Sequence, residues 1–299
     1  MAWSPDGTRV ASGGADGKIA LWDTTDDSFS SYTDTPLILS TPFTVIKALA
    51  WSPDGSMLAS VGNTSDIYVW YANGGTSSTY PIDVGAMTAL SWSPDNEHLA
   101  LVGTDATLRV ADALSGSNTS LADTSSSYTD TLNAVAWSPN GEYIACGGID
   151  QRVDIWNYEY NVFSGSYHQE NGPIDALAWS PDSKRIVSAK YNVYDPTASI
   201  EEWDALTGEN AFTYGSNTPP SGVDTVAWCH LSENLAHFAQ ITCTYRLEER
   251  SQPIGLSHNV ARHRSSSILP NIRSDKIIVF SRITWRVSLE SRFGSGAIL

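Results

Sequence analysis

A segment built around Trp-Ser-Pro-Asp-Gly recurs along this chain and constrains its fold more than any other feature. Five copies align, and a sixth begins with Thr-Val-Ala-Trp at Thr225 and then loses the motif. The marker tryptophans are separated by 48, 41, 45, 42 and 49 residues, and they are Trp3, Trp51, Trp92, Trp137, Trp179 and Trp228. A period of about 40 to 45 residues suits one four-stranded sheet per repeat, so the sequence predicts a repeat architecture.

Each repeat has the chemistry of strands and hairpins. Apolar and polar residues alternate in short runs, and turn residues separate the runs. In Ser-Pro-Asp-Gly, proline presets φ at the second position of the turn, Asp favours the third, and glycine accepts the left-handed geometry that follows. We therefore expect a tight turn between the first and second strands, and a second hairpin around the Gly-x-x-Asp region. The third strand ends in Trp-Asp at Trp22-Asp23 and at Trp203-Asp204.

With this period and this set of motifs, residues 2–228 resemble the WD40-repeat family. The resemblance implies an all-β chain forming a WD40-type β-propeller, in which four-stranded blades surround a central channel. Five blades are recognisable, and a partial or degenerate sixth follows. The residues to which the resemblance gives a structural role are Trp22, Trp70, Trp156, Trp203 and Asp16.

The chain departs from the family pattern at several positions. In the family, a His, an Asp of the second hairpin, a Ser or Thr and the Trp form a hydrogen-bonded tetrad within each blade. Here Pro42, Asp83, Tyr128, Glu170 and Pro219 stand where the His belongs, and Ala111 replaces the third-strand Trp in the third repeat. Asp16, Asp105 and Asp150 keep the acidic position, whereas Thr64 replaces it in the second repeat. A buried polar group without its partner costs about 1 to 3 kcal/mol, so we expect these blades to depend more on apolar packing.

The composition changes after Trp228, which divides the chain into blades at 1–228 and an anomalous, basic, Ser/Arg-rich tail at 229–299. The first part carries 28 acidic and 8 basic side chains, and the tail carries 5 and 9. Three explanations stay open. The tail could be the product of a reading-frame shift in the sixth repeat, a genuine extension, or a divergent blade with strands at Lys276 to Ser281 and Arg282 to Leu289. WD40 rings usually close when an N-terminal strand completes the last blade, and the absence of such a strand here predicts an open or strained ring.

Charge and motifs exclude several classes of function. The formal net charge of -16 disfavours binding to nucleic acid and to anionic membranes, which requires basic surface. The three cysteines lack zinc-binding spacing, which favours a reducing compartment and predicts a cytoplasmic protein. Motifs of hydrolases, nucleotide-binding loops and zinc proteases are missing, so we expect no enzyme activity, no metal and no cofactor. The repeated aspartates of the turns are explained by turn geometry.

The sequence therefore predicts a non-catalytic protein-interaction scaffold whose acidic surface binds a basic peptide or protein. Its expected contact residues, chosen by their positions in loops, are Tyr128, Asp130, Asp83, Asp105, Asp150 and Asp175. The alternative is a regulatory or targeting propeller that belongs to a larger enzyme, such as a kinase or peptidase. Two further alternatives are a catalytic propeller and a decaying gene product. The sequence gives no oligomeric state.

Overall fold

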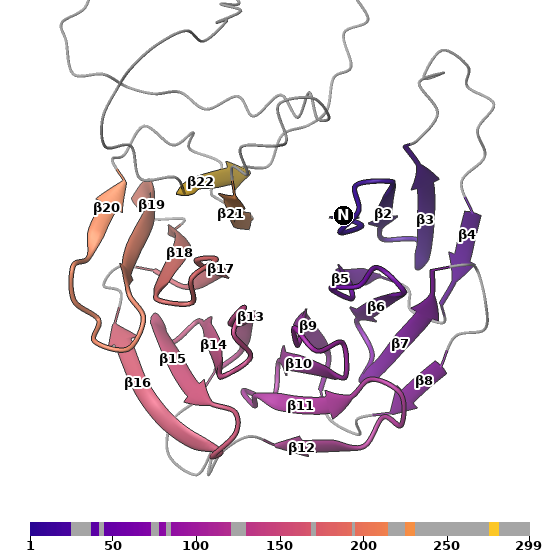
Figure 1. Cartoon of the computed structure of the whole chain (residues 1–299), viewed down its shortest axis with the longest axis horizontal. Coiled ribbons are helices and arrows are strands. Elements are labelled where there is room, and N and C mark those ends of the chain that lie inside the picture. The colour runs from indigo at the N-terminus through magenta and orange to yellow at the C-terminus, as the bar shows by residue number, and fades with distance from the viewer. Residues whose placement is uncertain are drawn as a thin grey trace, which may run out of the picture.

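The computed structural model describes residues 1–24, 37–41, 45–72, 78–81, 85–120, 130–168, 172–192, 195–214, 225–230 and 275–280. These residues form five four-stranded antiparallel sheets and one two-stranded sheet. In every four-stranded sheet the strands pair in sequence order. The sheets follow one another around an arc, with the first strand of each innermost and the fourth at the rim (Figure 1). Within these described residues, the structure confirms the prediction of an all-β fold with five four-stranded blades.

Each sequence repeat forms one blade, in chain order. The bounds of the strands in the first three blades are as follows. Blade 1 consists of β1 (Ala2–Trp3), β2 (Arg9–Gly13), β3 (Lys18–Asp23) and β4 (Leu37–Ser40). Blade 2 consists of β5 (Ile46–Trp51), β6 (Met57–Gly62), β7 (Asp66–Tyr71) and β8 (Ser78–Pro81). Blade 3 consists of β9 (Met87–Trp92), β10 (His98–Gly103), β11 (Arg109–Asp112) and β12 (Asn118–Ser120).

The last two blades continue this pattern. Blade 4 consists of β13 (Leu132–Trp137), β14 (Tyr143–Gly148), β15 (Arg152–Asn157) and β16 (Val162–His168). Blade 5 consists of β17 (Ile174–Trp179), β18 (Arg185–Asn192), β19 (Asp195–Asp204) and β20 (Phe212–Tyr214). Beyond them, β21 (Thr225–His230) pairs antiparallel with β22 (Asp275–Phe280). One strand of the anomalous tail thus joins the array, while residues 231–274 and 281–299 lie outside the described part of the chain.

The predicted turn after the innermost strand is organised by its buried serine. In blade 2, the Ser52 hydroxyl donates to the Asp54 carboxylate at 2.6 Å and accepts from the Met57 backbone N–H at 2.9 Å. The Asp54 carboxylate also accepts from the Ser56 N–H at 2.9 Å. The same bonds recur in the other four blades, where the serines are Ser4, Ser93, Ser138 and Ser180. The motif therefore recurs because its serine and its Asp or Asn satisfy the turn's own backbone.

Two of these turns also bond to the blade before them. Gly7, Gly55 and Gly141 hold the left-handed position in three blades, whereas Asn96 (φ 68°) and Ser183 (φ 59°) hold it in the other two. The Asn96 side chain accepts from the Asp54 N–H at 2.8 Å, and the Ser183 hydroxyl accepts from the Asn140 N–H at 3.0 Å. The strain of a positive φ is thus offset by a hydrogen bond between blades.

The innermost strands of blades 2 to 5 share a β-bulge four residues before the marker tryptophan. The pairing register skips one residue in each, and the skipped residues are Lys47, Thr88, Asn133 and Asp175. A bulge redirects the side chain of the extra residue. The Thr88 hydroxyl donates to the Leu132 carbonyl at 2.5 Å, and the Asn133 amide donates to the Ile174 carbonyl at 3.3 Å. Bulged polar side chains therefore join neighbouring innermost strands.

The marker tryptophans connect successive blades. The rings of Trp51, Trp92, Trp137 and Trp179 are buried between sheets, and the apolar cores likewise lie between successive blades and not within one blade. Four indole N–H groups donate to the carbonyl of the residue that precedes the marker tryptophan of the previous blade. The bonds are Trp51 to Ala2 (3.1 Å), Trp92 to Ala50 (2.9 Å), Trp179 to Ala136 (3.0 Å) and Trp228 to Ala178 (3.2 Å).

The seam between blades 3 and 4 departs from this pattern, and the sequence explains why. The residue before Trp92 is Ser91 and not alanine. The Ser91 hydroxyl accepts from the Trp137 backbone N–H at 3.0 Å, and the Trp137 indole instead donates to the Gly141 carbonyl at 3.2 Å. The Trp137 ring packs edge-on against Tyr158 with centroids 4.8 Å apart. A single hydroxyl thus changes the hydrogen bonding of a whole seam.

Of the four-residue hydrogen-bonded tetrad, the bond between tryptophan and serine is kept in three blades. Third-strand tryptophans donate to second-strand serines in blades 1, 2 and 5, and the pairs are Trp22 with Ser12 (3.1 Å), Trp70 with Ser60 (3.4 Å) and Trp203 with Ser188 (3.5 Å). Blade 3 has lost both members, since Leu101 and Ala111 stand at these positions. Trp156 of blade 4 is buried and packs edge-on against Phe163 at 5.4 Å. Asp16 is exposed and accepts from the Lys18 backbone N–H at 3.2 Å.

Candidate functional site

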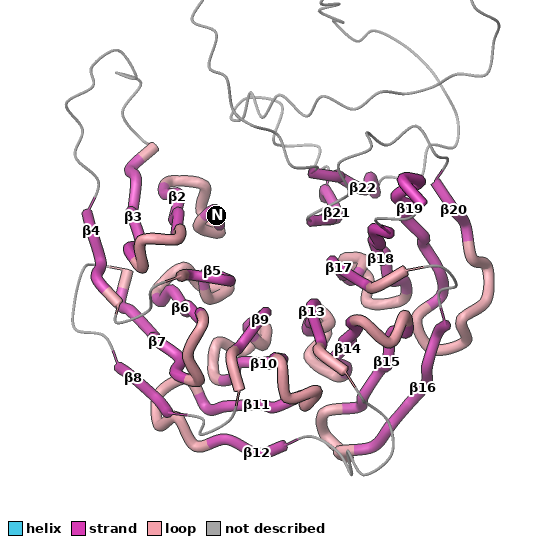
Figure 2. The backbone as a smooth tube through the Cα atoms, turned by 180° about the vertical axis from the view of Figure 1, so that it is seen from behind, coloured by secondary structure: helices cyan, strands magenta, loops and turns pink. Residues whose placement is uncertain are grey.

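The array has two faces, and each carries a different set of turns and loops. The turn face, as we call it, carries the Ser-Pro-Asp turns and the turns between third and fourth strands. The opposite loop face carries the hairpins between second and third strands and the connections from one blade to the next. Figure 2 shows the array from behind, with the described loops and turns in pink. Four of the contact residues predicted from sequence belong to the loop face, and they are Asp105, Asp130, Asp150 and Asp175.

The structure brings two of those residues into ion pairs. Asp105 lies 2.5 Å from the Arg109 guanidinium, and Asp150 lies 2.8 Å from Arg152 Nε. Arg152 also lies 3.4 Å from Asp154, whose side chain is 1% exposed. Burial raises the pKa of Asp150, although the charge of Arg152 opposes that effect. In these two blades an arginine thus pairs with the aspartate that the histidine of the family pattern would contact. From the sequence we had expected apolar packing to compensate for the missing histidine.

Two of the remaining predicted contact residues lie where innermost strands begin. Asp175 occupies the bulge of β17, and Asp130 accepts from the Thr131 N–H at 2.9 Å at the entrance to β13. Tyr128 and Asp83 lie outside the described residues. The bulge was missed from sequence because it depends on the pairing of two strands. Its sequence signal is a polar residue four positions before each marker tryptophan.

Acidic charge is concentrated on the turn face. Its described side chains comprise eleven acids and three bases, a net of -8. The acids are Asp6, Asp23, Asp54, Asp95, Glu97, Asp112, Glu142, Glu159, Asp182, Asp204 and Glu209, and the bases are Arg9, Lys184 and Arg185. The described side chains of the loop face comprise six acids and five bases, a net of -1, and these are Asp16, Asp66, Asp105, Asp130, Asp150, Asp175, Lys18, Lys47, Arg109, Arg152 and Lys190. The surface with the strongest negative charge is therefore the face opposite the predicted contacts.

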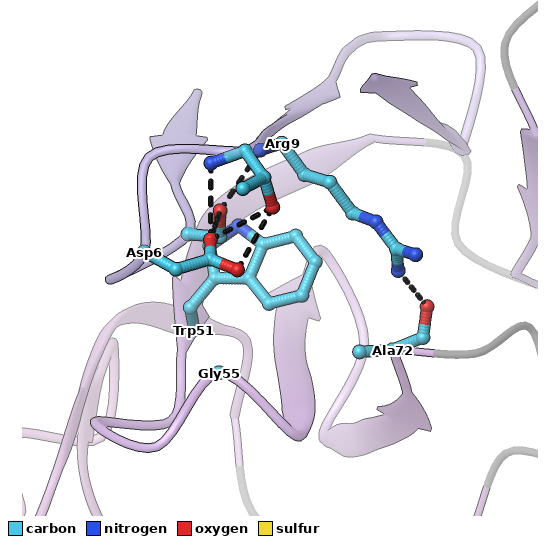
Figure 3. A pocket seen from close by; sticks show the side chains of 7 residues that line it. Asp6, Arg9, Trp51, Gly55 and Ala72 are labelled. Carbon is cyan, nitrogen blue, oxygen red and sulfur yellow. Dashed lines mark hydrogen bonds between the residues drawn. The ribbon is translucent and has the colours of Figure 1, made fainter. Parts of the chain in front are cut away.

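Two of the three bases on the turn face have internal partners. Arg185 pairs with Glu202 and lies 3.4 Å from Asp204. Arg9 donates to the Ala72 carbonyl across the seam between blades 1 and 2. A cavity of about 280 Å³ lies beside this bond, and Figure 3 shows Arg9 reaching past Trp51 toward Ala72. The polar groups that line the cavity are hydrogen-bonded to one another. The cavity is therefore part of the contact between the turns of blades 1 and 2.

The acidic turns hold their charge at low pH. Hydrogen bonds from Ser4 and Thr8 lower the pKa of Asp6 to about 2. The Ser52 hydroxyl and the Ser56 N–H lower the pKa of Asp54, and the Ser180 hydroxyl lowers that of Asp182. These carboxylates remain ionised at neutral pH and keep the turn face negative.

A first prediction follows from Asp182. Its folded pKa lies below the unfolded value, so its charge stabilises the fold above the unfolded pKa, and this contribution is lost as the pH falls through the folded pKa. We expect Asp182→Asn to lower stability near neutral pH by less than about 1 kcal/mol, because solvent screens the exposed carboxylate. The loss should shrink in acid. Asparagine fits this turn, since Asn140 already accepts from Ser138 at 2.7 Å in blade 4.

Urea unfolding of wild type and Asp182→Asn at neutral and acidic pH checks this result. Asn140→Asp is the reciprocal control, and its stability should become more sensitive to acid. An equal loss from Asp182→Asn at both pH values would contradict the assignment of the effect to charge.

The turn face is most acidic around aromatic rings in blades 3 and 4. The ligand atoms of Asp95, Glu97 and His98 lie within 4.8 Å of one another, so this group could hold a metal ion. Asp95 is already engaged by Ser93 and by the Glu97 N–H at 2.9 Å. The His98 ring lies 5.6 Å from that of Tyr158. Burial and the charges of Asp95, Glu97 and Asp112 raise the pKa of Tyr158. Carboxylates beside aromatic rings suit a cationic side chain.

Within the residues that the structure describes, there is no helix with the length and apolar character needed to cross a bilayer. Two family models match the chain. The model described as WD domain, G-beta repeat, matches residues 1–23 and 38–71. The model described as eukaryotic translation initiation factor eIF2A matches residues 57–193. Among curated proteins, no match was found. The segments matched by the WD-repeat model fall on blades built with the same turn and the same tryptophan seam, and the matches together with the five four-stranded sheets are consistent with a WD40-repeat β-propeller.

Proposed function

We propose that the chain is a non-catalytic scaffold in the cytoplasm that binds a basic peptide or protein through its turn face. WD40 repeats support the scaffold role. The observation that supports the chosen face is its net charge of -8 among described side chains, against -1 on the loop face. A surface of one sign attracts a partner of the opposite sign and gives association that weakens with salt.

The centre of the proposed contact lies at blades 3 and 4. Glu97, Glu142 and Glu159 are exposed there, and none of them serves as the turn carboxylate. They adjoin His98 and Tyr158, whose tilted rings can contact a lysine or arginine side chain. Asp105 and Asp150 contribute less to this proposal than the sequence suggested, because each has an arginine partner.

Charge reversal tests this function. We expect Glu97→Lys, Glu142→Lys and Glu159→Lys together to weaken binding of a fluorescent Lys/Arg-rich peptide at least about tenfold, and to flatten the salt dependence of its Kd. The control is Asp16→Lys, Asp66→Lys and Asp130→Lys on the loop face, which changes the total charge equally. Anisotropy titrations at several salt concentrations measure both effects. Equal weakening by the two triple variants would refute a contact on the turn face.

The match to the initiation-factor model favours a second candidate, a role in translation initiation. It covers residues 57–193, which include the proposed centre of contact. We propose that such a role would run through a protein partner, because the net charge of -16 opposes direct contact with RNA. Sedimentation of the protein with purified ribosomal subunits tests it. Failure of wild type to co-sediment would remove this candidate and leave the basic-peptide proposal standing.

A further inference from the structure

One sheet face of blade 1 has the composition of a seam but is open to solvent. Trp3 is 57% exposed, whereas its equivalent Trp51 in blade 2 is 7% exposed. Trp22 is 43% exposed, whereas its equivalent Trp70 is 8% exposed. Trp51 and Trp70 pack against blade 1, so Trp3 and Trp22 point away from blade 2 at the end of the array. The sheet face that packs against the preceding blade in blades 2 to 5 is thus exposed in blade 1.

The hydrogen bonds of the seams leave one donor and one acceptor at opposite ends of the array. Each regular seam joins a marker indole to the carbonyl before the previous marker. The Trp3 indole has no such acceptor among the described residues. At the other end, the carbonyl of Ala227, which precedes Trp228, has no such donor in the described chain. The two ends are therefore complementary halves of one seam.

The β21–β22 sheet packs against blade 5 in the same way as each blade packs against the one before it. Trp228 donates to the Ala178 carbonyl at 3.2 Å, and Val226 is buried against the apolar face of blade 5. Ala227 has the same small side chain as Ala2, Ala50, Ala136 and Ala178, whose carbonyls accept the other indoles. A methyl group leaves room for an indole to approach the backbone. The β21–β22 sheet can therefore offer blade 1 the surface that blade 1 offers blade 2.

We propose that the β21–β22 sheet docks on the open face of blade 1 of the same chain, where the Ala227 carbonyl accepts the Trp3 indole N–H. Figures 1 and 2 both place the N-terminus and β21–β22 at the two ends of one arc. Ends joined by one chain meet at a high effective concentration, which favours this occupant over a second copy. Docking buries Trp3 and Trp22 and completes a ring of the six innermost strands β1, β5, β9, β13, β17 and β21.

Hydroxyl-radical footprinting of the full chain, read by mass spectrometry, tests this docking. If the ring closes, Trp3 is oxidised at a rate comparable to that of Trp51. If the array stays open, the exposed fractions of 57% and 7% predict oxidation of Trp3 about eightfold faster than that of Trp51. The slow oxidation of Trp51 and Trp92 in the same sample shows that the blades are folded.

Two variants and a dilution series identify the occupant. Ala227→Arg places a long charged side chain in the proposed seam and should restore fast oxidation of Trp3 while Trp51 stays protected. Ala211→Arg makes the same change at an exposed position of blade 5 and should leave Trp3 protected. Fast oxidation of Trp3 in the wild type overturns the proposal, as does protection that survives Ala227→Arg. Protection that disappears on dilution also overturns it, because the occupant is then a second copy.

Discussion

Replacing Trp203 by alanine is expected to lower the free energy of unfolding by about 3 to 5 kcal/mol, because a large ring leaves a cavity that the seam cannot fill. The Trp203 side chain is 0% exposed. Its ring stacks on Tyr167 of blade 4 with centroids 4.4 Å apart and an angle of 18° between the planes. Its indole donates to the Ser188 hydroxyl at 3.5 Å. The substitution therefore removes packing between two blades and leaves a buried hydroxyl without its donor.

Urea denaturation followed by circular dichroism measures this loss as a lower midpoint with an unchanged slope. Tyr160→Ala is the matched control, since Tyr160 is 69% exposed, and we expect it to change stability by less than about 0.5 kcal/mol. Trp203→Phe should lie between the two. A loss below about 1 kcal/mol from Trp203→Ala would show that the seam between blades 4 and 5 is loosely packed.

Removing the guanidinium in Arg152→Met should be about as costly, at 3 to 5 kcal/mol, because it leaves buried charge without a partner. Asp154 is 1% exposed, and Arg152 is the cation beside it at 3.4 Å. Arg152 also lies 2.8 Å from Asp150, whose pKa burial has already raised. A carboxyl with a raised folded pKa favours the folded state as the pH falls, so the penalty of Arg152→Met should diminish in acid.

The double variant Arg152→Met, Asp154→Leu is the decisive control. It replaces a buried ion pair by apolar side chains of similar size, which is often neutral or stabilising. We therefore expect it to recover most of the stability that Arg152→Met loses. Chemical denaturation of the single and double variants across pH measures the recovery. If the double variant is no more stable than Arg152→Met, the cost does not arise from the unpaired carboxylate of Asp154.

The position and composition of the blades could be predicted from the sequence because they depend on local chemistry. The Ser-Pro-Asp-Gly turn satisfies its own backbone within a few residues, as Ser52, Asp54 and Met57 show. The third-strand tryptophans and their serines likewise lie within one blade, 10 to 15 residues apart. Repetition of such short-range patterns carries enough information to divide the chain into sheets.

The candidate site could not be predicted in the same way. The exchange of histidine for Arg109 and Arg152 depends on which side chains meet across a hairpin. The bulge that carries Asp175 depends on the register of β17 against β18. The concentration of acid on the turn face depends on all five blades having the same orientation. Each of these features depends on how strands pair, and the positions of loops in the sequence do not reveal that pairing.

The sequence alone thus determined the repeat, its turns and the five sheets, since their stabilising contacts lie within one period. The tertiary structure decided how the sheets meet. Each regular seam joins residues 42 to 50 positions apart, from Trp92 with Ala50 to Trp228 with Ala178. A side chain at that distance finds its partner only after both blades have folded and stacked. This is why the change caused by Ser91, and the open face around Trp3, became visible only in the assembled array.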